Sequence, residues 1–392
     1  MNPPPETIAS AVVLFAAMAA YALFSGADFG AGVWDLLAGS AERGERPRAT
    51  IAASVTPVWE GNHVWIIFGL VVVWTAFPPL FASVMTALFV PLFLSLAGIF
   101  FRGLGFAFRM EARRLRSRRL LGATFAASSV IAPFFLGAVI GAVATGRVPF
   151  PAVGNDLAAW TSPVPVVTGV LFVSACAYLA AVYLVGDAHR RGETVMVRYF
   201  ARRAFAAGVV TGLLAAVNML LLRTGAPYVF DGLVGRALPL VALSVAAGIA
   251  ALGLILLRRY RLLRFTAALA VTSVVAGWGW AQYPWLVPGT LTLTEGSASP
   301  SALWALLGVT GLAVLLVVPS FAYLYWLQQH ERLVESEAAD DLRRRIDLAH
   351  GRPVPLGPEE PPPPKRPDGF VLAVVVASAA IRLIRRLTGR GR

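Results

Sequence analysis

The sequence predicts an all-α membrane protein with nine transmembrane helices, and its composition is the first of three observations that predict this. Of the 392 residues, 57% are hydrophobic and 14% are charged, and the mean hydropathy is +0.70. A soluble globular domain usually has roughly 45–50% apolar and about 25% charged residues. The chain is therefore too apolar and too poor in charge for an ordinary soluble fold.

The second observation is a series of nine uncharged stretches, each long enough to cross the hydrocarbon core of a bilayer, which takes about 17–25 residues. Strands of a membrane barrel need only about 9–11 residues of alternating polarity, so these long uniform stretches favour helices. In chain order the predicted spans are Thr7–Ala27, Ala52–Phe77, Pro79–Phe101, Leu120–Ala144, Val164–Val185, Ala204–Leu222, Leu238–Leu257, Phe265–Ala281 and Ser301–Leu327. Proline and glycine in the segment 284–289 end the eighth span.

The third observation is the placement of arginine. Arginine-rich segments follow the first, third, fifth, seventh and ninth spans, and the segment 102–119 alone holds seven arginines. The loops on the other side contain only Arg147, Arg223 and Arg236. Cytoplasmic loops carry the excess of Lys and Arg, so this alternation predicts an N-terminus outside the cell and a C-terminus in the cytoplasm. The net charge of +13 thus reports orientation in a membrane, and we expect no nucleic-acid partner.

Beyond the membrane domain, predicted over residues 1–327, the composition changes. Residues 328–368 form a predicted charged and proline-rich cytoplasmic tail, which contains the sequence PEEPPPPKRP. Residues 369–392 predict a basic amphipathic segment on the anionic inner membrane surface. A tenth crossing is the alternative, but it would export the most basic end of the chain. At the other end, no basic region precedes the first span, so we expect it to be retained rather than cleaved as a signal peptide.

Two acids lie within or at the inner edge of the predicted spans, Asp28 and Glu60, with Asp35 as a borderline third. An acid at membrane depth costs several kcal/mol unless it is paired, hydrated or protonated, so such an acid is a candidate for function. The predicted topology places both in the cytoplasmic half of the membrane. Asp28 falls at the cytoplasmic edge and Glu60 roughly 13 Å deep, counting about 1.5 Å of helix per residue.

Glu60 lies in the sequence PVWEGNHVW, residues 57–65, where it stands three residues before His63 and therefore shares a helix face with it, with Asn62 beside them. A carboxyl and an imidazole held together away from water can exchange protons near neutral pH. The alternative is a hydrogen-bonded pair that only joins two helices. The residues themselves leave both interpretations open.

Haem and metal binding by this chain are not expected. The other three histidines lie in predicted cytoplasmic loops or in the tail, which argues against a bis-histidine haem site within the spans. The single cysteine, Cys176, excludes an internal disulfide and a cysteine-based metal cluster.

Several separated stretches together resemble one family, the second subunit of cytochrome bd-type quinol oxidases. They are YALFSGADFGAGVWDLL (21–37), PVWEGNHVW (57–65), WTAFPPLFASVMTALFVPLFLSLAGIFFRGLGFAFR (74–109), WGWAQYPWLVP (278–288) and LVVPSFAYLYW (316–326). The resemblance covers about residues 1–327. It implies nine helices, arranged as two four-helix bundles plus one peripheral helix, with the same orientation that the arginines predict.

The resemblance also implies a heterodimer in the cell membrane. Subunit I would carry the haems, b and d or b-type only, together with the quinol site, and would reduce O2 to water. This chain would be its haem-free partner, in which a quinone can be bound structurally. In the family, acids of this subunit near the cytoplasm line a proton route, and the matching positions here are Asp28 and Glu60. The sequence departs from the family pattern at Ser25, which replaces an aspartate, and at His63, which stands where glutamine or glutamate is often found.

The hypothesis from the sequence is therefore a proton route through this subunit. Asp28 takes up protons at the cytoplasmic mouth, Glu60 relays them with His63 beside it, and Trp59 and Asn62 hold the helix against the haem subunit. Because Ser25 replaces the first aspartate of the family pattern, Asp28 is the only entry acid expected on this helix. Two other classes of function remain: a multi-pass secondary transporter of a small solute, and a subunit that only stabilises its partner.

Overall fold

The computed structural model describes residues 3–40, 43–55, 59–111, 115–151, 154 and 157–329. For residues 55, 59–60, 109–111, 115–119, 321 and 324–329 it describes the backbone alone. The last helix ends at Gln329. Apart from residues 328 and 329, the predicted tail, 328–368, and the predicted amphipathic segment, 369–392, therefore lie outside the described residues.

The described part of the chain is helical apart from one small hairpin. Its elements are α1 (Pro5–Leu36), α2 (Glu45–Val55), α3 (Trp59–Asn62), α4 (Val64–Ala76), α5 (Pro78–Ala87), α6 (Phe89–Glu111), α7 (Leu115–Ala144), α8 (Leu157–Thr161), α9 (Pro163–Arg190), α10 (Thr194–Gly225), α11 (Pro227–Val234), α12 (Leu238–Leu256), α13 (Leu263–Gln282), β1 (Trp285–Val287), β2 (Leu291–Thr292), α14 (Leu293–Gly296) and α15 (Pro300–Gln329). The strands β1 and β2 pair antiparallel.

Among the described residues, seven helices are long and apolar enough to cross a membrane: α1, α6, α7, α9, α10, α12 and α15. An eighth is added if α4 and α5, which meet at a bend of 117°, count as one span. This confirms an all-α, multi-pass membrane protein. The count of nine stays a prediction, since α4 has only 13 residues and α13 is not among the seven.

The predicted second span, Ala52–Phe77, is wrong as one continuous helix. Within the described residues the helix is interrupted at His63, between α3, which ends at Asn62, and α4, which begins at Val64. Gly61 and Asn62 immediately before the break both have low helix propensity. At its other end α4 stops before Phe77, whose φ of −133° and ψ of 61° are not helical, because a residue that precedes proline is disfavoured in the helical region.

The predicted third span, Pro79–Phe101, is also divided, into α5 and α6. The break falls at Leu88, three residues before Pro91. Proline has no N–H, so Pro91 cannot continue a helix by donating to the carbonyl of Ala87. The helix α6 then continues well past Phe101 to Glu111, which places Arg102 inside a helix instead of in the loop that the sequence suggested.

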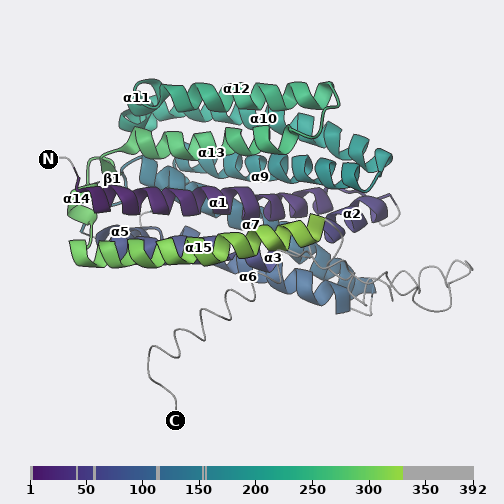
Figure 1. Ribbon diagram of the computed structural model, residues 1–392, viewed down its shortest axis with the longest axis horizontal. Coiled ribbons are helices and arrows are strands. Elements are labelled where there is room, and N and C mark those ends of the chain that lie inside the picture. The colour runs from purple at the N-terminus through teal and green to yellow at the C-terminus, as the bar shows by residue number, and fades with distance from the viewer. Residues whose placement is uncertain are drawn as a thin grey trace, which may run out of the picture. The chain divides into compact units, whose positions relative to one another are not determined.

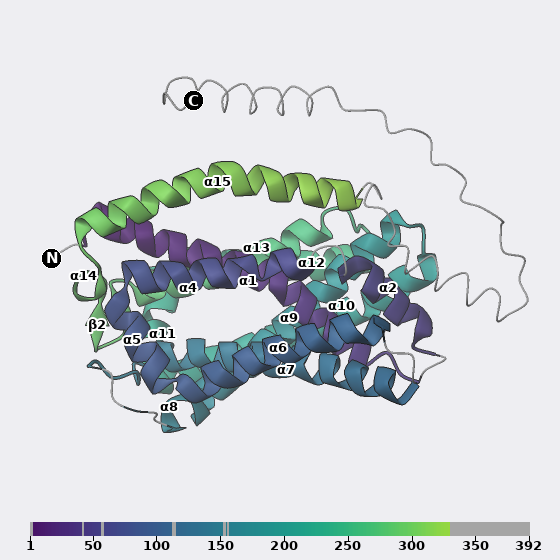
Figure 2. The same cartoon turned by 90° about the horizontal axis from the view of Figure 1, so that it is seen from below.

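The helix α1 lies at the centre of the membrane domain. It packs against α4, α7, α9, α13 and α15 (Figures 1 and 2). The helix α6 packs on α7, α10 on α9, and α12 on α13, while α5 joins one end of α4 to one end of α6 (Figure 2).

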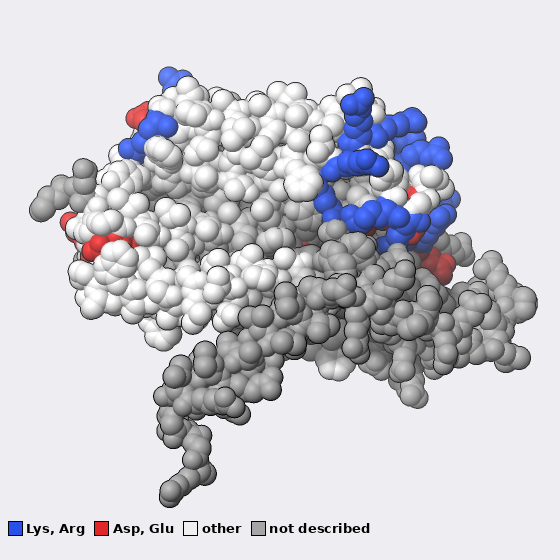
Figure 3. Space-filling model, viewed as in Figure 1, with Lys and Arg blue, Asp and Glu red and all other residues white. Residues whose placement is uncertain are grey.

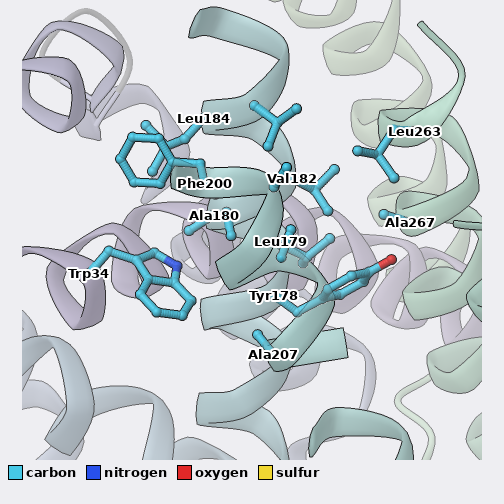
Figure 4. Packing of buried hydrophobic residues seen from close by; sticks show 14 of the residues in the cluster. Trp34, Tyr178, Leu179, Ala180, Val182, Leu184, Phe200, Ala207, Leu263 and Ala267 are labelled. Atoms are coloured by element: carbon cyan, nitrogen blue, oxygen red, sulfur yellow. The ribbon is translucent and has the colours of Figure 1, made fainter. Parts of the chain in front are cut away.

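The largest buried cluster surrounds α9, which is packed between α1, α10 and α13. Trp34 of α1, Tyr178 and Leu179 of α9, and Phe200 of α10 contribute to it (Figure 4). The indole Nε1 of Trp34 donates a hydrogen bond of 2.8 Å to the carbonyl of Ala177. Because this bond joins a side chain of one helix to the backbone of the other, it requires α1 and α9 to lie close together.

Basic side chains gather at one end of the domain. Figure 3 shows most of the Lys and Arg surface at the end where α1, α9 and α12 finish and α10 and α13 begin. The predicted arginine-rich loops that lie in the described residues therefore meet on one side of the domain. The alternation of arginine-rich and arginine-poor loops along the sequence requires this arrangement.

Candidate functional site

Four buried polar side chains from three helices meet near the C-terminal half of α1. They are Ser25 and Asp28 of α1, Asn62 of α3 and Arg102 of α6, and all four are at most 4% exposed. We call this set the polar cluster. Polar groups so deeply buried in a membrane protein are costly unless they bind one another, so their meeting calls for an explanation.

Two hydrogen bonds fix α3 against α1. The hydroxyl of Ser25 donates to the backbone carbonyl of Asn62 over 2.8 Å, and the side-chain amide Nδ2 of Asn62 donates to Oδ2 of Asp28 over 2.6 Å. Ser25 and Asp28 stand three residues apart and therefore face the same neighbour. The two bonds hold the short helix α3, which also contains Trp59 and Glu60, in a defined position on α1.

Arg102 brings a positive charge to this buried acid. Its guanidinium donates a hydrogen bond of 2.9 Å to the backbone carbonyl of Asp28 and interacts electrostatically with the Asp28 carboxyl. The guanidinium carbon also lies over the rings of Phe29 and Phe125, at 5.2 and 5.1 Å from their centroids. One hydrogen bond and two cation–π contacts thus stabilise the buried guanidinium, whose Nε has no hydrogen-bond partner among the described residues.

His63 lies at the margin of the polar cluster. It is half-buried between α3 and α4, and its ring meets the ring of Phe29 edge to face with centroids 6.1 Å apart. The side chains of Trp59 and Glu60 lie outside the described residues, so the roles predicted for them stay predictions. No three His, Cys, Asp or Glu side chains gather as a metal site within the described ranges.

Asp35 belongs to the same helix as Asp28, because α1 continues to Leu36. Nε of Arg48 on α2 lies 3.6 Å from Oδ1 of Asp35, and the same guanidinium donates to the carbonyls of Gly39 and Ser40. Asp35 is seven residues beyond Asp28, about 10 Å closer to the basic end of the domain. Asp28 itself is 4% exposed, so its side chain is buried inside the bundle, and its predicted role in proton uptake stays a prediction.

The sequence alone missed Arg102, because it was counted with the other arginines of 102–119 as part of a cytoplasmic loop. One signal could have separated it. The next six residues, 103–108, carry no charge and read GLGFAF, which suits a continuing buried helix better than a loop.

Comparisons with known proteins identify one family and several relatives. The model of the family "Cytochrome bd terminal oxidase subunit II" matches residues 6–328. The chain is 30% identical over 130 residues to the cytochrome bd-I ubiquinol oxidase subunit 2 of Escherichia coli K12, a stretch that is 33% of each chain. It is 29% identical over 112 residues to the cytochrome bd ubiquinol oxidase subunit 2 of Bacillus subtilis 168, which covers 29% of this chain and 32% of that one. The aligned stretches thus span about a third of these relatives.

A solved structure of bd oxidase from Geobacillus thermodenitrificans has the same fold. A chain of that structure superposes with a TM-score of 0.66 at 22% sequence identity, over 83% of this chain and 98% of that one. At this identity the similarity concerns the fold alone.

Proposed function

Because this chain belongs to the cytochrome bd terminal oxidase subunit II family, we propose that it is the haem-free second subunit of a quinol oxidase that reduces O2 to water. Its partner would be the haem-bearing subunit I, which would hold the quinol and O2 sites. The complex would lie in the cell membrane, with this chain as a multi-pass subunit. A structurally bound quinone in this subunit remains an expectation from the family resemblance.

The polar cluster supports a more specific proposal. In this proposal, the subunit provides a proton route from the cytoplasm toward the haem subunit. Asp35 lies nearest the basic end, Asp28 lies deeper, and Asn62 connects Asp28 to the short helix that bears Glu60. His63 follows directly in the chain. Reduction of O2 consumes one proton for each electron, so a route that draws these protons from the cytoplasm helps to build a membrane potential.

Arg102 gives this route a physical basis. A buried acid that releases its proton leaves a charge in apolar surroundings, which is unfavourable unless an opposite charge is near. The guanidinium of Arg102 interacts with the Asp28 carboxyl and is held by the Asp28 backbone. We propose that this neighbouring positive charge allows Asp28 to release and take up a proton inside the bundle.

Replacement of Glu60 by glutamine tests the route. We expect O2 consumption to fall about 10-fold or more, since a positioned proton-transfer group is lost, while the haem absorbance of the purified complex stays unchanged. The solvent deuterium isotope effect on turnover should rise as proton transfer becomes limiting.

The matched control is Glu193→Gln, at a glutamate on the same basic end that accepts a hydrogen bond from Thr50 outside the polar cluster. It should keep full activity. If Glu60→Gln consumed O2 as fast as the wild-type complex, Glu60 would have no part in proton transfer, and a purely stabilising role for this subunit would be favoured.

We further propose nine spans: α1, α4, α6, α7, α9, α10, α12, α13 and α15. One four-helix bundle consists of α1, α4, α6 and α7, the other of α9, α10, α12 and α13, and α15 is peripheral because its main contacts are with α1 and α4 alone. The collection of basic residues at one end supports a cytoplasmic location for that end (Figure 3).

Cysteine labelling tests this orientation. In a Cys176→Ser background, an impermeant maleimide applied to right-side-out vesicles should label Arg223→Cys, near the outer end of α10. It should label Arg198→Cys, near the inner end, only after the membrane is permeabilised. Both arginines are exposed, whereas Cys176 is fully buried. Labelling with the opposite sidedness would reverse the topology and exclude proton uptake from the cytoplasm through the polar cluster.

A secondary transporter is the alternative function. Such proteins usually have discontinuous helices in both halves, around a site at the middle of the membrane. Here the breaks within predicted spans fall at His63 and Leu88, whereas α9, α10, α12 and α13 each run without interruption. Because the helix breaks lie in only one half of the chain, the structure favours an oxidase subunit over a secondary transporter.

A further inference from the structure

The helix α12 ends in a Schellman motif that has an arginine at the position where glycine is usual. The backbone N–H of Arg258 donates to the carbonyl of Ile255, and that of Arg259 donates to the carbonyl of Leu254. This geometry requires a left-handed residue, and Arg258 has φ 55°. Among the described residues it is the only non-glycine with positive φ.

The helix α9 ends on the same side with the same motif. Gly192, with φ 71°, donates to His189, and Glu193 donates to Ala188. Glycine adopts this conformation without steric cost, while any residue with a Cβ atom is disfavoured there. An arginine kept in the strained position suggests that its side chain serves a purpose other than closing the helix.

The surroundings of Arg258 are strongly basic. The segments 187–203 and 258–264, which include the turn between α9 and α10 and the turn between α12 and α13, hold nine arginines and two acids. Of these acids, Asp187 already binds Arg190 and Arg264, and Glu193 accepts a hydrogen bond from Thr50. Arg258, Arg259 and Arg261 are exposed, and no described residue supplies an acid to any of them.

Exposed apolar side chains flank these three arginines. Leu256, Leu257, Leu262 and Phe265 are 60–72% exposed. On a membrane protein such side chains face acyl chains, and the neighbouring arginines then lie at the level of the lipid headgroups. The stretch Leu256–Phe265, which we call the α12–α13 corner, therefore offers an apolar and a cationic surface side by side.

We propose that the α12–α13 corner binds an anionic phospholipid, with Arg258, Arg259 and Arg261 on its phosphate and the exposed leucines against its acyl chains. Guanidinium groups bind phosphate through paired N–H donors. The exposed leucines and phenylalanine favour a lipid over a soluble phosphate compound, because only a lipid has acyl chains that can contact them. The left-handed conformation at Arg258 then has a function, because it adds a third exposed arginine to this corner.

The test uses the full chain in its complex, purified in detergent and titrated with phosphatidylglycerol in native mass spectrometry. Arg258→Gly should weaken phosphatidylglycerol binding about fivefold, the equivalent of about 1 kcal/mol for one arginine near an anionic surface. Adding Arg259→Gln and Arg261→Gln should weaken it about a hundredfold. At the same time the melting temperature of Arg258→Gly, measured without lipid, should be unchanged or higher, because glycine relieves the strained turn.

Controls separate this site from general charge effects. Arg223 is an exposed arginine at the opposite end of α10, and Arg223→Gln should not change the affinity for phosphatidylglycerol. Phosphatidylcholine should bind the wild-type complex and the triple variant equally weakly. Equal phosphatidylglycerol binding by Arg258→Gly and wild type would overturn the proposal, as would a lower melting temperature of Arg258→Gly. Inorganic phosphate that displaced the lipid at a similar concentration would show that the site recognises free phosphate instead.

Discussion

Replacement of Arg102 by methionine is expected to lower the melting temperature of the purified complex by about 5 °C or more. The substitution removes the hydrogen bond to the Asp28 carbonyl and leaves the Asp28 carboxyl in the bundle without its neighbouring positive charge. Loss of a buried hydrogen bond from a charged group costs about 1.5–3 kcal/mol, and the two cation–π contacts of the guanidinium are lost with it. For a large domain each kcal/mol lowers the melting temperature by roughly 2–4 °C or somewhat less. Methionine keeps the helix propensity and much of the volume of arginine. The fall in melting temperature therefore measures the contribution of the charge and its hydrogen bond.

The double variant separates charge coupling from packing. If Asp28→Asn is added to Arg102→Met, both charges are gone, and we expect part of the lost stability to return. The amide of asparagine retains an oxygen that can accept the hydrogen bond from Nδ2 of Asn62, as Oδ2 of Asp28 does.

Arg198→Met is the matched surface control, because Arg198 is exposed on α10, and it should change stability by no more than about 0.5 kcal/mol. A double variant whose loss equals the sum of the two single losses would show that Asp28 and Arg102 are not coupled, and Arg102 could not then act as the countercharge of a proton carrier.

Replacement of Gly30 by alanine is expected to have a comparable effect on stability. A Cβ atom at Gly30 would lie 1.9 Å from the carbonyl oxygen of Cys176 on α9 and 2.7 Å from Cβ of Ala180. The obstructing oxygen belongs to helix backbone and cannot rotate away, so α1 and α9 must separate. Overpacking typically costs about 1–3 kcal/mol. The separation also stretches the bond from Trp34 to Ala177, which adds about 1 kcal/mol.

Gly26→Ala is the matched control, one turn earlier on the same helix. Its Cβ would meet only Sγ of Cys176 at 3.5 Å and Cδ1 of Leu179 at 3.6 Å, which are ordinary contacts. Because alanine has the higher helix propensity, Gly26→Ala should be neutral or mildly stabilising. Thermal unfolding of the two variants side by side checks this. Equal melting temperatures would mean that α1 and α9 do not approach as closely as the structure indicates.

Part of the site could be predicted from the sequence. Asp28, Glu60 and His63 are conspicuous in the sequence because they are polar residues in apolar stretches. The hydrogen bond from Asn62 to Asp28 holds α3 against α1 of this same chain, and the predicted role of Asn62 toward the haem subunit stays a prediction. Ser25 was noted only as a departure from a family pattern, and the structure shows it bound to the backbone of Asn62. Arg102 was assigned to a loop, because a cluster of arginines at the end of an apolar stretch is the usual sign of a membrane boundary.

The sequence by itself determined that this protein crosses a membrane repeatedly, as helices, with one basic side. These properties are local: a spanning segment must satisfy its own backbone hydrogen bonds and be apolar along its own length, and each loop carries its own charge. Only the tertiary structure decided which polar side chains meet. Arg102 and Asp28 are 74 residues apart, and Asn62 and Asp28 are 34 apart. Whether they bind depends on how closely helices pack, through contacts such as that of Gly30 with α9, and on where α3 and α4 break. Such contacts join residues far apart in the chain, so no periodicity or composition of a single segment records them.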